Sequence, residues 1–450
     1  MYLGGLSIDA RRIRAFSSNE AAASLLFLFQ NRKRACIMKV IVIKFGGSSL
    51  STPDKIRNAA ERILEEKRKG YEVTAVVSAM GKTTDQLVEL AGCMSKQPSK
   101  REMDMLLATG EQVSIALLSM ALSEMGSPAV SYTGWQAGII TEQIHSSARI
   151  IDVHIQAVRN QLEAGKAVVV AGFQGVCENG DITTLGRGGS DTTAVALAAA
   201  LGAERCMICT DVDGVYTSDP RYVKNARKLA SVSYDEMLEL AHLGAGVLHP
   251  RAVEFAKNYR VSLEVCSSQD KVLGTMIEEA VSMEKNLVVR GVAFEDRITR
   301  VSISGLRNEM TGLSAVFTAL AKSHIDVDII IQSREEDGKT SLAFTINEKD
   351  VSEAADILEK GKEQIGYDHI EYESGLAKVS IVGSGMVSNP GVAAQMFDIL
   401  AKRSICVKMV STSEIKVSVV IDKEHMERAA SLLHDTFGLA AAEKAAASMQ

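Results

Sequence analysis

Aromatic residues are scarce in this chain of 450 residues: they make up 5% of it, whereas hydrophobic residues as a whole make up 46%. The core must therefore be built from valine, isoleucine, leucine, alanine and methionine. Such a composition favours α/β layers with nearly continuous apolar strands. The length is sufficient for two or three domains.

Long apolar runs and basic blocks are also lacking beyond the first residues. No run approaches the roughly 18 apolar residues that a membrane-spanning helix needs, so a membrane is not expected as a partner. The net charge is −6. No basic block stands outside the N-terminus, which argues against nucleic acid as the main partner.

The seven cysteines form no framework. Their odd number and wide scatter are typical of a reducing compartment, so we expect a cytoplasmic protein. Cys206 and Cys209 have C-x-x-C spacing but lie within an apolar run, which favours a buried strand over zinc or redox chemistry. Cys177, His242 and His249 show no nucleophile–base arrangement, and this argues against acyl transfer.

Residues 1–37 differ in composition from the rest of the chain. They carry six basic residues against only Asp9 and Glu20, together with a short apolar piece at 25–29. A targeting peptide is one interpretation. The one we favour is a disordered tail, or upstream sequence translated in error, because Met38 would start the following strand cleanly.

From residue 38 to about 280 the pattern alternates between strands and helices, which predicts one domain with a mainly parallel sheet covered on both faces. Ligands in such sheets bind beyond the carboxyl ends of the strands. Strands are expected at 39–44, 72–78, 128–132, 166–171, 205–210 and 261–266. Helices are expected at 54–69, 103–125, 148–163, 192–201 and 234–243.

The remaining third of the chain contains an internal repeat. Residues 301–305 match 379–383, and each copy reads strand, helix, strand, strand, helix. The first copy adds a strand at 369–372, whereas the second ends at a helix. An extra strand at 287–294 precedes the repeat, and we expect it to pair with a repeat sheet and couple the copies. The expected divisions are a linker with this strand at 281–297, then units at 298–374 and 375–440.

The segment 40–49 is the first candidate site. A β-branched run ends in Lys44, and Gly46, Gly47 and two serines follow. Glycines allow a sharp turn and a close backbone approach. A helix from about Asp54 would point its positive N-terminus at the same spot. A cation, exposed amides and a helix dipole suit a phosphate; an ordinary strand-to-helix turn is the alternative.

The segment 183–193 is the second candidate site. It places Arg187 among three glycines directly before an apolar helix, which Ser190 or Asp191 can cap. The guanidinium is a planar fork suited to a carboxylate or a phosphate. A structural loop would not need both features.

Acidic residues mark two further places. Asp211 and Asp213 follow the 205–210 strand and could hold Mg²⁺, with a local turn as the alternative. Glu111 opens a helix, where it could bind an ammonium group or simply favour the helix start. Residues 81–84 resemble the end of a P-loop, but Val76 stands where that motif requires glycine.

In this order, the segments 44–49, 109–111, 172–175, 183–193 and 211–216 resemble aspartate kinases of the amino-acid-kinase fold. The duplicated C-terminal units resemble ACT domains, which are amino-acid-sensing βαββαβ modules. The resemblance covers residues 38 to about 437 and is greatest with the monofunctional bacterial type that has two ACT domains. It implies a three-layer α/β sandwich followed by two α+β regulatory domains.

The resemblance also implies an activity. ATP and L-aspartate would give 4-phospho-L-aspartate and ADP, the first step of lysine, threonine and methionine synthesis, with Mg²⁺ as a cofactor. The side-chain carboxylate of aspartate is already ionised at pH 7, so no general base is needed. Catalysis then consists of positioning and of neutralising charge on the transferred phosphoryl group.

The family motifs assign roles residue by residue. Lys44 and Asp191 would be catalytic. The nucleotide would be held by Lys44, Phe45, Gly46, Gly47, Ser48, Arg62, Thr210, Asp211, Tyr216 and Arg221. Aspartate would be held by Ser78, Thr84, Glu111, Arg187, Gly188, Gly189 and Ser190, with Arg187 on its α-carboxylate and Glu111 on its ammonium.

Regulation is implied by the ACT units. Lysine, threonine or both would inhibit by binding there, in a homo-oligomer or in a catalytic and regulatory hetero-oligomer, for which Met283 offers an internal start. Effector contacts would come from Asn308, Thr311, Asp326, Asp328 and Gln332 in the first copy, and from Val392, Ser413 and Glu414 in the second.

The chain departs from the family pattern in two places. Gly246 stands where many members carry a nucleotide-contacting lysine, and residues 308–312 lack the usual D-x-P-G turn. Two alternatives remain open: a family member acting on glutamate, acetylglutamate or UMP, and a non-catalytic amino-acid sensor. Arg187 with Glu111 favours a zwitterionic substrate. The intact Lys44, Arg187 and Asp191 argue against the sensor.

Overall fold

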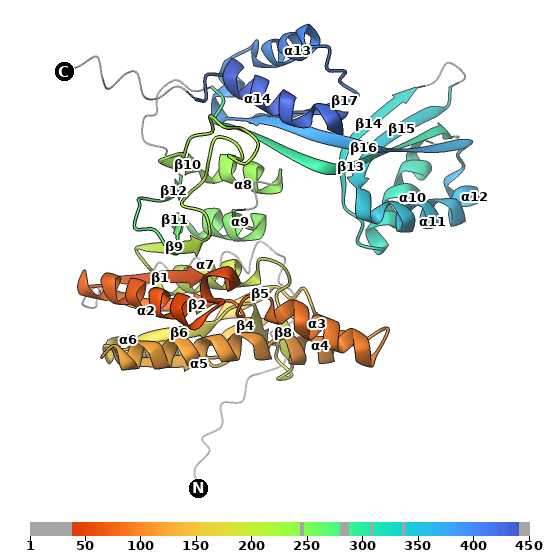
Figure 1. Ribbon diagram of the computed structural model, residues 1–450. Helices are drawn as coiled ribbons and strands as arrows, with labels where there is room; N and C mark the ends of the chain where they lie inside the picture. The colour runs from red at the N-terminus through yellow and green to blue at the C-terminus, as the bar shows by residue number, and fades with distance from the viewer. Residues whose placement is uncertain (1–37, 244–246, 280–287, 307–308, 335–337, 441–450) are drawn as a thin grey trace, which may run out of the picture.

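The computed structural model describes residues 38–243, 247–279, 288–306, 309–334 and 338–440 (Figure 1). Residues 1–37, Gly246, Met283 and Asn308 therefore lie outside the described residues, and so do the predictions made for them. The residues before 280 form one lobe, and the repeat forms a second lobe beside it.

An eight-stranded sheet forms the centre of the first lobe. Its order is β10-β12-β11-β9-β1-β2-β6-β3, and only the β11/β12 pair is antiparallel. This confirms the predicted mainly parallel sheet. The strands are β1 (Val40–Phe45), β2 (Glu72–Val77), β3 (Ala129–Tyr132), β6 (Ala167–Ala171), β9 (Arg205–Thr210), β10 (Ser231–Ser233), β11 (Leu263–Ser267) and β12 (Thr275–Glu278).

Helices cover both faces of this sheet because its strands are apolar on both sides. In β1, Val40 and Val42 belong to one buried cluster, whereas Ile41, Ile43 and Phe45 belong to another. The first cluster contains α6 (Gln156–Glu163), α7 (Gly189–Leu201), α8 (Tyr234–His242) and α9 (Pro250–Tyr259); the second contains α2 (Pro53–Arg68) and α5 (Thr109–Glu124). The result is a three-layer sandwich.

Two predicted helices differ from the structure. The helix expected at 148–163 begins only at Gln156, because the β-branched residues of β5 (Ile150–Val153) form a strand instead. That strand belongs to a small sheet, in the order β5-β4-β7-β8, with β4 (Ile139–Thr141), β7 (Gln174–Val176) and β8 (Ile182–Thr184). The helix expected at 103–125 is divided into α4 (Lys100–Leu107) and α5, and α3 (Thr83–Met94) precedes them.

The sequence was expected to contain no segment long and apolar enough to span a membrane, and the consecutive helices α4 and α5 correct this expectation. The stretch Lys100–Glu124 is long and apolar enough, by length and composition, to cross a membrane. Its buried positions nevertheless include the carboxylates of Asp104 and Glu111, and Leu118 and Leu122 pack into the core below the central sheet. A core helix pair is the interpretation that this packing supports.

The second lobe is one six-stranded sheet in the order β14-β15-β13-β16-β18-β17. Its strands are β13 (Gly291–Leu306), β14 (Val327–Arg334), β15 (Thr340–Asn347), β16 (His369–Val382), β17 (Met409–Thr412) and β18 (Lys416–Asp422). Its helices are α10 (Glu309–Lys322), α11 (Val351–Lys360), α12 (Lys362–Ile365), α13 (Val392–Lys402) and α14 (Met426–Thr436).

Two long strands connect the repeat copies. The first half of β13, 291–295, pairs with 378–382 of the second copy, and its second half pairs with β15 and with the start of β16. The strand before the repeat therefore closes the second copy, which ends in a helix of its own. This confirms that the segment pairs with a repeat sheet and couples the copies.

Candidate functional site

The predicted site residues follow strands that are neighbours in the sheet. The order β9-β1-β2-β6 is parallel throughout, so the four carboxyl ends meet at one edge. Thr210 ends β9, Gly46 follows β1, Ser78 follows β2, and Gly172 follows β6. The topology thus brings together segments that are far apart in the sequence, at the edge where such sheets bind ligands.

Lys44 and Asp191 are in contact. The Nζ of Lys44, near the end of β1, lies 2.6 Å from Oδ1 of Asp191 in the first turn of α7, and both side chains are about one-eighth exposed, at 12%. A carboxylate so close holds the ammonium group in place without removing it from the ligand space. The structure therefore provides an oriented and partly exposed cation.

The turn after β1 requires glycine at position 47. A Cβ there would lie 2.7 Å from the carbonyl oxygen of Ala79, and the Gly81 N–H donates to the Gly47 carbonyl at 2.9 Å. The Gly46 N–H makes a long hydrogen bond, 3.4 Å, to the Cys209 carbonyl, so it is directed into the sheet. The predicted use of both glycine amides for phosphate is therefore better supported for Gly47.

Two further residues of this turn have limited means to contact a nucleotide. The Phe45 side chain is fully buried, so only its backbone faces the turn. Ser48 is exposed, and its carbonyl accepts a hydrogen bond from the Lys55 side chain at 2.8 Å. Their predicted roles therefore reduce to backbone contacts for Phe45 and to a hydroxyl for Ser48.

Glu111 is a buried carboxylate at the start of α5. It accepts hydrogen bonds from the Ala79 N–H at 3.0 Å and from the Gln174 side chain at 3.5 Å. Burial raises its pKa to about 7, although the hydrogen bonds to it act in the opposite direction. Because burial makes its charge costly, a cationic partner would stabilise the ionised form.

The loop before α7 presents Arg187 to solvent. Gly186 and Gly188 on either side of it have positive φ angles of 76° and 69°, which favour glycine. A Cβ on Gly188 would lie 2.2 Å from the ring of His249. The loop can therefore take this path only with glycine, and its arginine side chain is left exposed.

Other predicted aspartate contacts lie around this loop. A Cβ on Gly172 would lie 2.8 Å from the Ser190 hydroxyl, so Ser190 abuts the turn after β6. The Thr193 hydroxyl accepts from the Phe173 N–H at 3.2 Å and donates to the Gly189 carbonyl, which links that turn to α7. Ser78 and Thr84 are half-buried beside the end of β2 and at the start of α3.

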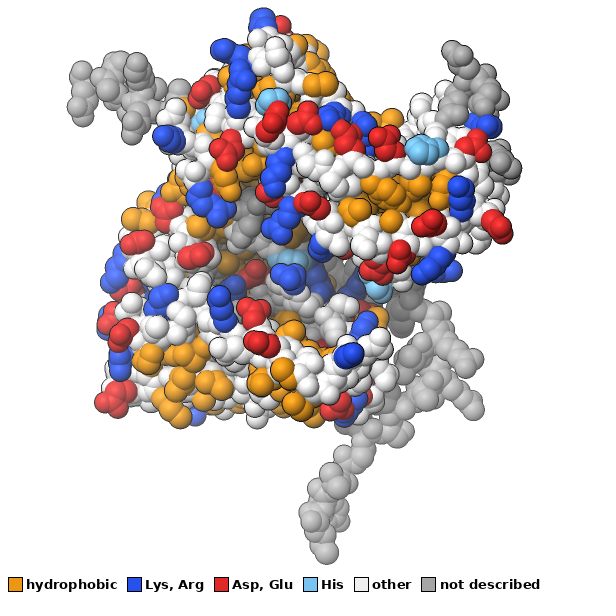
Figure 2. Space-filling model, turned by 45° about the vertical axis from the view of Figure 1, so that its right-hand side comes forward, with side chains coloured by type: hydrophobic (Ala, Val, Ile, Leu, Met, Phe, Trp, Pro, Cys, Tyr) orange, Lys and Arg blue, Asp and Glu red, His pale blue; other side chains and the backbone are white. Residues whose placement is uncertain are grey.

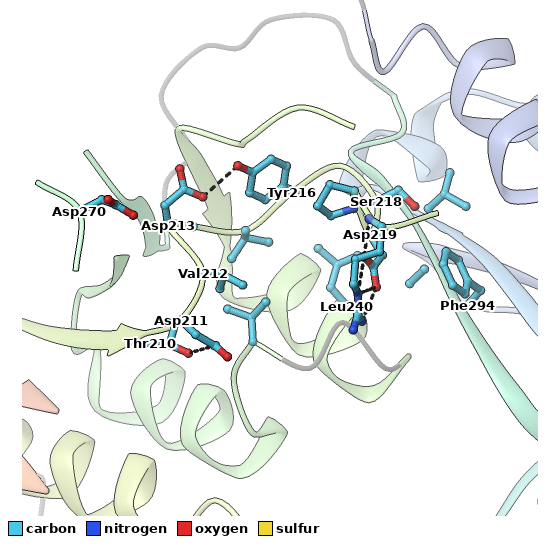
Figure 3. Close-up of a pocket in the computed structure, with 17 residues that line it drawn as sticks. Thr210, Asp211, Val212, Asp213, Tyr216, Ser218, Asp219, Leu240, Asp270 and Phe294 are labelled. Atoms are coloured by element: carbon cyan, nitrogen blue, oxygen red, sulfur yellow. Dashed lines mark hydrogen bonds and ion pairs between the residues drawn. The ribbon is translucent and has the colours of Figure 1, made fainter. Parts of the chain in front are cut away.

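A cavity of about 590 Å³ lies beyond the end of β9 (Figure 3). All four residues predicted there for the nucleotide line it: Thr210, Asp211, Tyr216 and Arg221. Sequence reasoning missed Leu240, Val247, Asp270 and residues 292–294 of β13. The β13 residues belong to the six-stranded sheet of the second lobe, and no local sequence pattern in them points to a nucleotide.

The acids in this cavity differ in how they are engaged. Asp213 accepts hydrogen bonds from the Tyr216 hydroxyl and from Lys228 Nζ, both at 2.9 Å. Burial acts to raise its pKa, but these hydrogen bonds lower it overall. Asp211 is exposed and accepts a hydrogen bond from Thr210 at 3.0 Å. Asp211 therefore fits a metal ligand better than Asp213, whose two oxygens already have partners.

Arg221 and Arg62 differ from their predicted roles. The guanidinium of Arg221 binds the Asp219 carboxylate at 2.6 to 3.0 Å, so a nucleotide would share or replace that pair. Arg62 lies on α2 beside the thiols of Cys209 and Cys266, and it does not line the cavity.

A hollow lies between the two lobes in the space-filling view, and basic side chains gather inside it (Figure 2). Two hydrogen bonds join the second lobe to the first. The Val292 N–H donates to the Thr217 carbonyl at 2.8 Å, and the Ser384 hydroxyl donates to Glu236 at 2.8 Å. The cavity that Val292 lines is therefore in physical contact with the second lobe.

The predicted effector residues are mostly exposed. Thr311, Asp326, Gln332, Ser413 and Glu414 are exposed, and Val392 is half-buried at the start of α13. Asp328 on β14 forms an ion pair with the buried Lys378, which also lies 3.2 Å from Glu295. An effector that contacts Asp328 would therefore meet a residue already engaged across the repeat.

Sequence comparisons match most of the described chain to known families. Residues 39–267 match the amino acid kinase family, and residues 299–363 and 379–437 each match an ACT domain. The chain is 64% identical over 402 residues to Aspartokinase 2 of Bacillus subtilis, covering 89% of this chain and 98% of that protein. It is 60% identical to the aspartokinase of Geobacillus stearothermophilus over 91% of this chain and 99% of that protein.

Structural comparison gives the same neighbours. The structure of Escherichia coli aspartokinase III in complex with aspartate and ADP, described as its R-state, is 26% identical with a TM-score of 0.75, over 88% of this chain and 99% of that one. The complex of the same enzyme with lysine and aspartate, described as its T-state, has a TM-score of 0.71 at the same identity and coverage.

Proposed function

The chain belongs to the aspartokinases of the amino acid kinase family, and we propose on this basis that it transfers the γ-phosphoryl group of ATP to the side-chain carboxylate of L-aspartate. The observation that carries the proposal is the high identity to aspartokinases over almost their full length. The site supports it, because the first lobe provides an oriented lysine, a carboxylate that needs a cation, an exposed arginine and a cavity of about 590 Å³.

The reaction needs little from the protein beyond placement and charge. An oxygen of the ionised aspartate side chain attacks the γ-phosphorus, while the bond from that phosphorus to the β,γ-bridging oxygen breaks. ADP leaves with the electron pair, and 4-phospho-L-aspartate forms. Lys44 neutralises charge on the transferred group, and Asp191 at 2.6 Å keeps its ammonium aimed at that group.

Recognition of aspartate follows from complementary charges. Arg187 would bind the α-carboxylate through its planar fork. Glu111 would bind the ammonium group, which lowers the cost of ionising a buried carboxylate. Ser78, Thr84 and Ser190 would supply hydroxyl groups around the substrate.

The nucleotide would occupy the cavity that Thr210, Asp211 and Tyr216 line. Mg²⁺, which neutralises phosphate charge when it is bound, would be held by Asp211 together with phosphate oxygens. Lys44 and the Gly47 amide would bind the phosphates from β1 and the turn after it, in the middle of the central sheet.

Regulation, assembly and location complete the proposal. Lysine or threonine would bind the ACT units and act through the contact between the regulatory sheet and the nucleotide cavity. Exposed apolar residues on α3 and α5 support an oligomer: Val88, Leu90, Met94, Val113, Leu117 and Met120. The free cysteines among the described residues are consistent with a cytoplasmic protein.

A hydroxamate assay tests the activity. Hydroxylamine traps an acyl phosphate, so incubation with ATP and L-aspartate should give aspartate hydroxamate. Glutamate should give far less, and omission of the amino acid should give none. Preferential product from glutamate would indicate another amino acid kinase, and no product from any substrate would indicate a sensor without catalysis.

A further inference from the structure

The loop that carries Arg187 has glycine on both sides of the arginine, so no adjacent side chain fixes its position. Both glycines have positive φ angles, and the N-terminus of α7, which follows, has no side-chain cap. Arginine binds a carboxylate well only when its fork is aligned with both oxygens. The position of Arg187 must therefore be set by residues outside the loop.

One such residue is Asp104, a fully buried carboxylate on α4. It accepts a hydrogen bond from the Thr184 hydroxyl at 2.6 Å, from the Ser146 N–H at 3.0 Å and from His145 Nδ1 at 2.9 Å. A buried carboxylate with this many donors fixes all of them, because losing any one leaves charge uncompensated. Thr184 ends β8, two residues before the glycine that starts the Arg187 loop.

A second residue binds the backbone directly after the same strand. Arg251, at the start of α9, donates to the Leu185 carbonyl and to the Ala148 carbonyl, both at 2.9 Å. Its guanidinium is thus used to bridge two backbone segments. The segments also bind each other directly, because the Ala148 N–H donates to the Thr184 carbonyl at 2.9 Å.

A strained residue lies between these two anchors. Ser146 has a φ angle of 71°, unusual for a residue with a side chain. Its N–H is held by Asp104, and its carbonyl lies 3.1 Å from where a Cβ of Gly186 would be. Strain of this kind persists only where the surroundings enforce it. Here it places the 142–148 segment directly against the first glycine of the loop.

We propose that Asp104 and Arg251 are positioning residues for aspartate, which clamp the end of β8 at the Thr184 hydroxyl and the Leu185 carbonyl and thereby align Arg187. In Figure 1, α4 and β8 lie side by side at the outer end of the first lobe. Neither residue touches the substrate in this account. The inference rests on the proposed role of Arg187.

Steady-state kinetics of Arg251→Lys and Asp104→Asn test the proposal. A lysine cannot bridge both carbonyls, and an asparagine keeps only one acceptor oxygen. Each variant should raise the aspartate KM by about 10-fold, since small misplacements of binding groups have effects of this order or larger. The ATP KM should change less than about twofold. A purely structural role would lower the melting temperature without separating the two KM values.

Matched controls change exposed residues of the same two types. Arg260→Lys changes the arginine at the other end of α9, which is exposed and 3.8 Å from Glu279. Asp235→Asn changes an exposed carboxylate on α8 that pairs with Lys257. Both controls should leave both KM values at the wild-type level. Equal changes in the controls and in the test variants would overturn the proposal.

A double-mutant cycle separates this inference from the function on which it rests. Arg187→Ala should itself raise the aspartate KM, and adding Arg251→Lys should then raise it little further, because the clamp acts through Arg187. Full additivity would overturn the clamp. An unchanged aspartate KM in Arg187→Ala alone would instead refute the proposed carboxylate contact.

Discussion

Single residues at this site carry charges that are placed before any substrate arrives. Lys44 is held by Asp191 at 2.6 Å, and Glu111 is buried with only neutral hydrogen-bond donors around it. The first arrangement presents a positive charge, and the second creates a need for one. A zwitterionic substrate next to a polyphosphate satisfies both.

Glu111 should make aspartate binding depend on pH. Its pKa is raised to about 7 by burial, so it is mostly neutral at pH 6 and mostly ionised at pH 8. Because only the ionised form attracts the substrate ammonium, the aspartate KM should fall by about 10-fold over this range. Initial rates measured at each pH with ATP saturating would show it.

Glu111→Gln provides the control for that profile. The variant should bind aspartate weakly at every pH and lose the dependence between pH 6 and 8. A wild-type KM that stays constant over this range, or the same slope in the variant, would be inconsistent with an ammonium site at Glu111.

The sequence pointed to candidate site residues only where they belong to a local motif. Lys44, Arg187 and Asp191 could be selected because glycines, a strand end and a helix start surround them. Phe294 could not be selected from the sequence, because it lines the cavity only when the second lobe packs against the first. Asp104 and Arg251 likewise carry no local signal, since their partners lie far away in the chain.

At the scale of elements, the site depends on how closely two turns approach. Gly47 after β1 lies against Ala79 after β2, and Ala79 in turn donates its N–H to Glu111. The same backbone contact therefore joins the phosphate side of the site to the aspartate side. Any atom added between the turns would disturb both.

Gly47→Ala should therefore damage activity as well as stability. The new Cβ would lie 2.7 Å from a backbone oxygen, which cannot move as a flexible side chain can. Overpacking of this kind costs about 1–3 kcal/mol. We expect a lower melting temperature and a reduced kcat, measured by thermal unfolding and steady-state rates.

Gly92→Ala is the matched substitution. Gly92 lies within α3, where a Cβ would meet nothing within 4 Å. Alanine favours a helix, so this variant should be as stable as the wild type or slightly more stable, with the same kcat. If Gly47→Ala behaves as Gly92→Ala does, the close approach of the turns has no functional role.

Element boundaries were predicted where one pattern dominated and missed where two competed. The β1 and β9 runs are mainly apolar and were assigned to within one residue. Residues 148–163 mix a β-branched stretch with a helical one, and pairing with β4 decided in favour of a strand at 150–153. The strand that closes the second ACT copy comes from before the first copy, so the sequence predicted its pairing with a repeat sheet but not which copy it joins.

At the scale of the whole molecule, the two lobes meet through buried polar contacts beside the nucleotide cavity. The His434 ring on α14 is fully buried, and its Nε2 lies 2.9 Å from the Thr217 hydroxyl of the first lobe. Lys416 on β18 lies 2.8 Å from Glu239 on α8. These contacts tie the second lobe to Thr217 and Glu239, each of which is next in the sequence to a cavity-lining residue.

His434 should make the folded protein less stable in mild acid. Burial lowers its pKa, so the folded state keeps it neutral while the unfolded chain takes up a proton below about pH 6.5. Stability is therefore complete above that pH and is lost as the pH falls through it, by at most about 1.4 kcal/mol per pH unit. Denaturant unfolding at pH 7.5 and 5.5 measures this loss.

Replacing His434 measures how much of this loss of stability comes from its ring. His434→Gln should show a smaller difference between the two pH values than the wild type does. His154→Gln, which changes an exposed ring that pairs with Asp152, should retain the wild-type difference. If His434→Gln loses as much stability between pH 7.5 and 5.5 as the wild type does, protonation of the buried ring does not contribute to the loss.

The central claim is that Lys44 neutralises the phosphoryl group during transfer to aspartate. Its most direct test is the steady-state comparison of Lys44→Ala with the wild type, with ATP and aspartate varied separately. We predict a fall in kcat of about 10²–10³-fold, typical for loss of one transition-state contact, with the aspartate KM changed far less. A Lys44→Ala enzyme with the wild-type kcat would contradict the account.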